Sequence, residues 1–190
     1  MMLTPRWLVL MLALLASCAR YAGPSRGVAG RGAGDDWKQV TNIELVRQEA
    51  SNDCGAAAAA MVLTHWGSPT SLEELQTDLP ATKGGVRAHE LRDALLKRGL
   101  QAFVIEGTMA DLEYEIAQGR PVIVGTLKSL KNGQRVHHFE VVVAIQRERQ
   151  LIMTLDPSLG WRKFSYAGFE SEWLGSAHTT IVALPPEPSI

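Results

Sequence analysis

The sequence lacks an excess of charge of either sign, because 19 Lys and Arg residues face 20 Asp and Glu residues among its 190. Nucleic-acid-binding domains usually carry a basic face and a high pI, so nucleic acid is not an expected partner. Only two cysteines are present, which excludes a fold held together by several disulfides. What the chain does have is 46% hydrophobic and 21% charged residues, a composition typical of one globular domain.

The first residues have the pattern of an export signal. Residues 1–17 combine Arg6 with the apolar run 7–15, which is shorter than the roughly 20 residues of a membrane-spanning helix. The signal ends in Leu-Ala-Ser-Cys, and this ending at Cys18 resembles a bacterial lipobox. The resemblance implies cleavage before Cys18 and attachment of lipid to its thiol. The alternative is an ordinary cleaved signal that happens to contain a cysteine.

The next segment predicts a spacer. Residues 18–36 are rich in Gly, Ala and Arg and show no period, which is typical of a flexible, lipid-anchored tether. Ala19 stands where lipoproteins of the inner membrane carry Asp, which implies the outer membrane, facing the periplasm. The folded domain is then expected over residues 37–190.

Helix patterns come early in this domain and strand patterns come late. Helices are predicted over residues 54–66, 87–98, 109–118 and 169–173, with a short helix opened by the capping box at 71–74. Strands are predicted over residues 101–105, 121–127, 136–145, 151–155 and 179–184. This order favours an α+β fold over alternating βαβ units.

Cys54 is the one free thiol left if Cys18 carries lipid. It begins the alanine-rich helix 54–66, and the positive end of a helix dipole lowers the pKa of a thiol. An exported protein meets an oxidising compartment, where an unpaired thiol is used or buried. Cys54 could therefore be a nucleophile, with Gly55 leaving room for a substrate carbonyl, or simply a small buried apolar residue.

A thiolate nucleophile needs a proton partner, and the chain offers five histidines. His65 lies 11 residues further along the same helix, about 16 Å away, so it cannot reach the thiol. His89 begins another helix, and His178 stands in a loop without a nearby acid in sequence. His137 and His138 begin the strongest strand, and alternation lets only one of them face the cysteine.

Three further polar residues could complete such a site. Asp156 follows the strand 151–155, and antiparallel pairing would return it to His138 to fix the imidazole tautomer; it could also merely initiate a turn. Gln48 could donate its amide to an oxyanion hole or be an ordinary loop residue. Glu140 faces the same side as His138, where it could assist binding, pair with an arginine or mark an edge strand. Because adjacent His137 and His138 point apart, a metal site there is not favoured.

These residues also stand in a familiar order. Gln-Glu-Ala-Ser-Asn-Asp-Cys-Gly at 48–55 resembles the N-terminal motif of the double-glycine, bacteriocin-processing cysteine peptidases. His-Phe-Glu-Val-Val-Val at 138–143 resembles the histidine strand of that family, and Asp-Pro at 156–157 resembles its acidic turn. The resemblance covers roughly residues 45–184.

The resemblance implies a papain-like fold, with N-terminal helices packed on a C-terminal antiparallel sheet. It implies that Cys54 is the nucleophile, His138 the general base and acid, and Asp156 the residue that orients the imidazole. Gln48 and the Cys54 amide would hold the oxyanion. Attack on a peptide or protein substrate would give a thioester that water hydrolyses, with no metal or organic cofactor.

The chain also departs from that family. Its processing peptidases are usually fused to a membrane transporter and an ATPase, and no Walker-type Gly-x-x-x-x-Gly-Lys-Ser/Thr motif occurs here. An export-system partner would then be encoded separately, and cleavage after Gly-Gly does not follow from the motif. The expected function is a cysteine peptidase of the bacterial cell envelope. The alternatives are a catalytically silent peptide-binding or adaptor module, and an acyltransferase that uses the same thioester.

Overall fold

The computed structural model describes residues 21–29, 36–79, 82 and 84–186, in which helices and strands follow the expected order. The expected signal segment 1–17 and Cys18 lie outside the described residues. The helices are α1 (Cys54–His65), α2 (Leu72–Asp78), α3 (Ala88–Lys97), α4 (Met109–Ala117), α5 (Tyr166–Trp173) and the 3-10 turn η1 (Leu174–Ser176). The strands are β1 (Arg26–Gly27), β2 (Lys38–Gln39), β3 (Gln101–Glu106), β4 (Val122–Ser129), β5 (Arg135–Gln146), β6 (Leu151–Asp156), β7 (Gly160–Ser165) and β8 (Thr179–Leu184).

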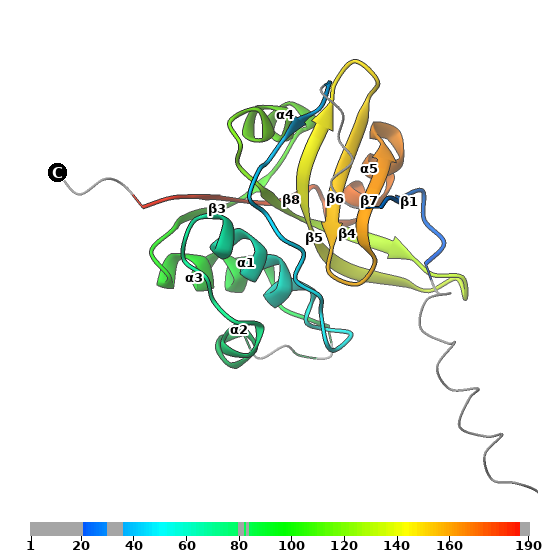
Figure 1. Ribbon diagram of the computed structural model, residues 1–190. Helices are drawn as coiled ribbons and strands as arrows, with labels where there is room; N and C mark the ends of the chain where they lie inside the picture. The colour runs from blue at the N-terminus through cyan, green and yellow to red at the C-terminus, as the bar shows by residue number, and fades with distance from the viewer. Residues whose placement is uncertain (1–20, 30–35, 80–81, 83, 187–190) are drawn as a thin grey trace, which may run out of the picture.

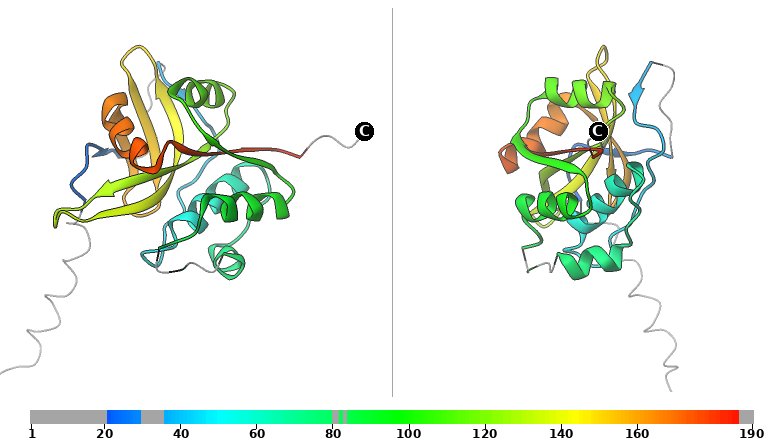
Figure 2. Two further views of the ribbon diagram at one scale, coloured as in Figure 1. Left: turned by 180° about the vertical axis from the view of Figure 1, so that it is seen from behind. Right: turned by 90° about the vertical axis from the view of Figure 1, so that its left-hand side faces the viewer.

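The strands form one antiparallel sheet in the order β1-β7-β6-β5-β4-β8-β3, with β2 paired to β5 beside this path. Helices α1, α2 and α3 gather beside the sheet, while α5 packs against β4 and β7 (Figure 1). The views in Figure 2 also show α1, α2 and α3 apart from α5. The expected α+β class, with helices packed on an antiparallel sheet, is confirmed. No helix in the described ranges has the length and apolar character needed to span the bilayer.

Helix α1 is buried on every side, which its alanines make possible. Residues 54–63 are all buried, so small side chains let the helix lie close to β5, α2 and α3. A Cβ at position 55 would collide with Val86 and Leu91, so Gly55 serves packing rather than access of a substrate. Asp53 takes the N-cap position but makes no side-chain capping bond, because its carboxylate accepts from the Ala50 amide and from Gln76.

Besides the short strand β2, two segments differ from the sequence-based expectation. Strand β7, which forms a hairpin with β6, was not expected because its polar residues do not give a strand pattern in the sequence. Residues 21–28, expected within the flexible tether, instead pair with the sheet at two places: Tyr21 bridges to Leu130, and Arg26 and Gly27 lie opposite Lys163 and Arg162 of β7. We call residues 21–28 the N-terminal strap. Composition does not reveal this contact, because backbone pairing and a few polar side chains hold the strap.

The close packing of α1 makes a stability prediction. Ala57 is fully buried, and Ala57→Leu adds three carbon atoms where no space exists, so we expect the free energy of unfolding to fall by about 1–3 kcal/mol. Ala117→Leu makes the same change at an exposed position of α4 and should stay within about 0.5 kcal/mol. Urea unfolding of both variants measures the difference. Equal losses would show that α1 is not packed as described.

Candidate active site

Three elements bring Cys54, His138 and Asp156 together. Cys54 begins α1, His138 lies in β5, and Asp156 ends the neighbouring strand β6. His138 Nε2 lies 2.8 Å from Asp156 Oδ1, and the imidazole also hydrogen-bonds the Cys54 sulfur. Since Asp156 takes Nε2, the sulfur is left to Nδ1. The arrangement is a hydrogen-bonded chain from carboxylate to imidazole to thiol.

The carboxylate end of this chain is held most firmly. Asp156 has no solvent exposure, and its Oδ1 accepts backbone N–H groups from Ser158 at 2.8 Å and Leu159 at 3.0 Å. Asp156 therefore both initiates the turn and reaches His138, so the two sequence readings describe one geometry. Cys54 and His138 are 5% and 9% exposed, which leaves a narrow approach to the sulfur.

The three groups shift one another's pKa values. Burial alone would lower the pKa of His138, but the Asp156 charge and the hydrogen bonds to Asp156 and Cys54 raise it to about 10. Burial would raise the pKa of Cys54, but the bond and charge of His138, with the Phe139 and Gly55 amides, lower it below its ordinary value. These directions favour a thiolate–imidazolium pair at neutral pH.

A second set of charges lies behind Asp156, and we call it the buried charge cluster: Lys128, Glu140, Asp156 and Glu172. Lys128 Nζ lies 2.7 Å from Glu140, 3.0 Å from Glu172 and 3.5 Å from Asp156. Burial would raise the pKa of Asp156, but the charges of His138 and Lys128 hold it well below its usual range. The sequence-based interpretation missed Lys128 and Glu172, since neither stands in a motif.

The position of Glu140 distinguishes among the three interpretations of this residue. It is fully buried in a central strand, so it is not an edge-strand charge, and its charged partner is a lysine rather than an arginine. Its other oxygen accepts the Thr154 hydroxyl at 2.6 Å. Both carboxylate oxygens are therefore engaged inside the protein, which leaves none to bind a substrate.

Gln48 lies next to the acidic turn but does not touch the thiol. Its backbone N–H donates to the Pro157 carbonyl at 3.2 Å, which fixes the segment beside Asp156. Its side-chain Nε2 donates to the Ala50 carbonyl at 2.9 Å, and Oε1 is buried without a hydrogen-bond partner. The amide is thus near the site, with one N–H of Nε2 uncommitted.

The other histidines lie elsewhere. His65 stacks edge-on against Trp66 at the far end of α1, and His89 is exposed. His178 pairs with Glu170 at 2.6 Å, an acid that a turn of helix brings near although it is distant in sequence. His137 is exposed, next to His138. Within the described ranges, no three His, Cys, Asp or Glu side chains are grouped as metal ligands.

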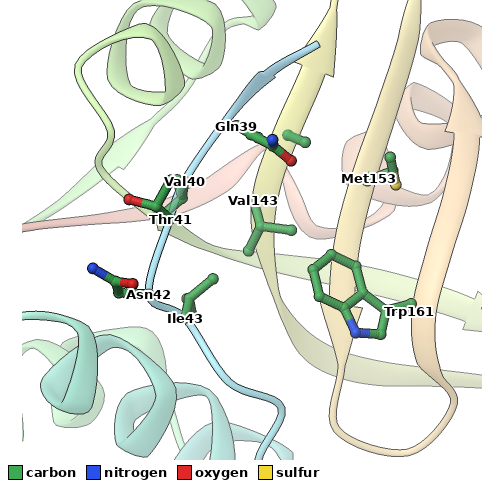
Figure 3. A pocket seen from close by; sticks show the side chains of 9 residues that line it. Gln39, Val40, Thr41, Asn42, Ile43, Val143, Met153 and Trp161 are labelled. Atoms are coloured by element: carbon green, nitrogen blue, oxygen red, sulfur yellow. The ribbon is translucent and has the colours of Figure 1, made fainter. Parts of the chain in front are cut away.

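Two cavities flank the thiol and the imidazole. One of about 330 Å³ is lined by Cys54, and one of about 300 Å³ by His138. They share four lining residues, Gly84, Val86, His137 and Phe139, so an extended chain could pass from one to the other across the sulfur. A third cavity, of about 370 Å³, contains none of the three hydrogen-bonded residues. Figure 3 shows it between the segment after β2, with Val40 and Ile43, and the strand residues Val143, Met153 and Trp161.

Comparisons with known proteins agree with this geometry. Residues 42–182 match the model of the "Peptidase C39 family". The chain is 30% identical over 139 residues to the transport/processing ATP-binding protein PedD for pediocin PA-1 from Pediococcus acidilactici, with 72% of this chain covered. It is 31% identical to the corresponding mesentericin-Y105 protein MesD from Leuconostoc mesenteroides, with 70% covered. The match spans only 18% of the length of either relative.

Solved structures give the same result. The peptidase domain of Streptococcus ComA, a bifunctional ABC transporter, matches with a TM-score of 0.64 and 30% identity, over 75% of this chain and 98% of that one. A C39-like peptidase from Bacillus anthracis, at 16% identity and a TM-score of 0.63, covers 79% of this chain and 98% of its own, and it supports the fold alone. The expected papain-like fold is confirmed. From the family match and these structures together, the chain belongs to the peptidase C39 family, the double-glycine bacteriocin-processing peptidases, and is by that membership a cysteine-type peptidase.

Proposed function

We propose that this chain hydrolyses peptide bonds through a Cys54–His138–Asp156 triad. The observation that carries the proposal is the hydrogen-bonded chain from Asp156 through His138 to a cysteine with a lowered pKa. The thiolate attacks the substrate carbonyl carbon, and the imidazolium gives its proton to the leaving amine. A thioester and a free amine result. His138 then takes a proton from water, which attacks the thioester and releases the acid and the thiolate.

Gln48 and the Cys54 backbone amide are the proposed oxyanion donors. The Gln48 segment is fixed beside the acidic turn, and its Nε2 keeps one N–H beyond the bond to Ala50. A rotation of this side chain would bring that N–H toward the substrate oxygen. The buried Oε1 without a partner favours such a rotation, since the present position leaves a polar atom unsatisfied.

The proposed substrate is a peptide or protein that occupies both flanking cavities. One relative, a double glycine motif protease, 22% identical with a TM-score of 0.59, was solved in complex with a leader peptide. That protein supports a peptide as the substrate class. An export system that delivers such a peptide would be the partner.

The proposed setting is the bacterial cell envelope. A lipid on Cys18 would hold the chain at the outer membrane, facing the periplasm. Support comes from the signal-like residues 1–17 and the lipobox-like ending at Cys18. Residues 18–20 would then join the anchor to the N-terminal strap.

Removal of the nucleophile tests the hydrolase. We expect Cys54→Ala to reduce cleavage of a mixed peptide library by about 10³-fold or more, because no thioester can form. His89→Gln, at an exposed histidine that lines neither cavity, is the control and should retain kcat. Mass spectrometry of the products measures both, with circular dichroism as the check of folding. Undiminished cleavage by a folded Cys54→Ala variant would refute the triad, and amide products formed with an added amine would indicate an acyltransferase.

The ion pair makes a pH prediction. Iodoacetamide should alkylate Cys54 at nearly full rate well below pH 8.5, the region of a free thiol, because the pKa of Cys54 is lowered. In His138→Gln the rate should rise at higher pH than in the wild type, since only the Phe139 and Gly55 amides then oppose the effect of burial on the thiol pKa. Hydrolysis should decline as the pH rises through about 10, where His138 loses the proton needed by the leaving amine. Superimposable alkylation profiles would contradict the pair.

Lipid attachment is tested with the two cysteines as each other's control. In a bacterial host that processes lipoproteins, the wild-type chain and Cys54→Ser should incorporate labelled palmitate and sediment with membranes. Cys18→Ser should lose both properties, because its thiol is the proposed site of attachment. Mass spectrometry of the mature N-terminus identifies the modified residue. Lipid remaining on Cys18→Ser, or an unmodified Cys18 in the wild type, would disprove the anchor.

A further inference from the structure

The N-terminal strap reaches the buried charge cluster through Tyr21. The Tyr21 hydroxyl donates to Glu172 Oε1 at 2.7 Å, and its ring centroid lies 5.3 Å from Lys128 Nζ. Burial raises the pKa of Tyr21 to about 12, so the phenol stays a hydrogen-bond donor throughout the physiological range. A residue three positions from the proposed lipid anchor therefore contacts the charges that face Asp156.

The strap holds this tyrosine with a directed series of hydrogen bonds. Arg162 Nε donates to Ser25 Oγ at 2.9 Å, and the Ser25 hydroxyl donates to the Tyr21 oxygen at 2.9 Å. A second Arg162 nitrogen donates to the Ser25 carbonyl at 2.8 Å. Gly23 completes the fit, since a Cβ there would collide with Glu172 Oε1 and the Tyr21 hydroxyl. The donors from Arg162 Nε through the Ser25 and Tyr21 hydroxyls follow one another to the Glu172 carboxylate.

The Tyr21 contact can affect Asp156 through the buried charge cluster, because a single lysine in the cluster pairs with three carboxylates. Lys128 is 3% exposed, and its ammonium lies within 3.5 Å of Glu140, Glu172 and Asp156. Asp156 Oδ1 already accepts three bonds, whereas Oδ2 is buried, has no hydrogen-bond partner and faces the ammonium. The position of Lys128 therefore decides how much of the Asp156 charge remains for His138.

We propose that Tyr21 is a positioning residue for Asp156, acting from the N-terminal strap through Glu172 and Lys128. This rests on the proposed function, in which Asp156 orients His138. Tyr21 does not touch the substrate. By fixing Glu172, Tyr21 keeps that carboxylate beside Lys128, where it competes with Asp156 for the single ammonium. The Asp156 charge then remains directed at the His138 imidazole.

The sign of the effect follows from the groups around His138. The charged or titratable groups that face it directly or across the cluster are Cys54 from α1, Asp156 from β6, Lys128 from β4, Glu172 from α5 and Glu140 from its own strand. Without the phenol, Glu172 loses a hydrogen bond that lowers its pKa, so this pKa, which burial already raises, rises further and the carboxylate competes less for Lys128. Lys128 then compensates more of the Asp156 charge, so the pKa of His138 falls.

The test is Tyr21→Phe in the full chain, with the His138 ring titrated by NMR and its signal assigned by its loss in His138→Gln. Tyr166→Phe is the matched control, because the Tyr166 hydroxyl also donates to a glutamate, Glu113, at 2.9 Å outside the cluster. We expect Tyr21→Phe to lower the pKa of His138 by about half a unit or more, roughly a threefold change in the proton-dissociation constant. Tyr166→Phe should leave it unchanged. Equal shifts in the two variants would overturn the proposal.

Two further variants distinguish an effect that passes through the buried charge cluster from a general loosening of the fold. Tyr21→Phe should produce no shift in an Asp156→Asn background, because the proposed route ends at the carboxylate; an undiminished shift there would overturn it. Gly23→Ala displaces the strap without removing any polar group and should also lower the pKa of His138. This variant tests the proposal if Asp156→Asn does not fold. The titration needs no substrate. Absent hydrolysis with a Tyr21-dependent pKa would refute the proposed function alone, and the reverse result would refute this inference alone.

Discussion

The buried carboxylate of Asp156 is the constraint on which the site depends. One oxygen is saturated by His138 and two backbone amides, and the other faces the Lys128 ammonium. A buried carboxylate without such partners would take up a proton and lose its hold on the imidazole. The fold must therefore supply both the turn after β6 and a buried lysine from β4 before an ion pair can form at the cysteine.

The charges of this region are arranged on two sides of Asp156. On the side of α1, the imidazolium of His138 lies between the carboxylate and the Cys54 sulfur. On the other side, a single ammonium lies among three carboxylates, so negative charge is in excess there. An excess of negative charge behind a histidine favours its protonated form, which agrees with its raised pKa. Among these carboxylates, Asp156 is the one that acts directly on the pKa of His138.

The main elements and three of the site positions were accessible from sequence because their signals are local. An alanine run, capping boxes and β-branched runs identify helices and strands, and strand alternation places Glu140 on the same side as His138. The buried charge cluster was not accessible, because Lys128 and Glu172 acquire meaning only when β4 and α5 pack together. The strap escaped for a similar reason. Its composition is that of a linker, and its order comes from the free edge of β7 and from Arg162.

The strap and the acidic turn belong to one continuous piece of sheet. Strand β6 ends at Asp156, the turn leads into β7, and β7 pairs with β1 of the strap. Backbone pairing and the Tyr21 side chain therefore reach Asp156 by separate routes, one through the hairpin and one through the charge cluster. In an anchored chain, any force on the N-terminus would act first on these contacts. The order of the strands thus links the N-terminal strap to the acidic turn within the residues that the structure describes.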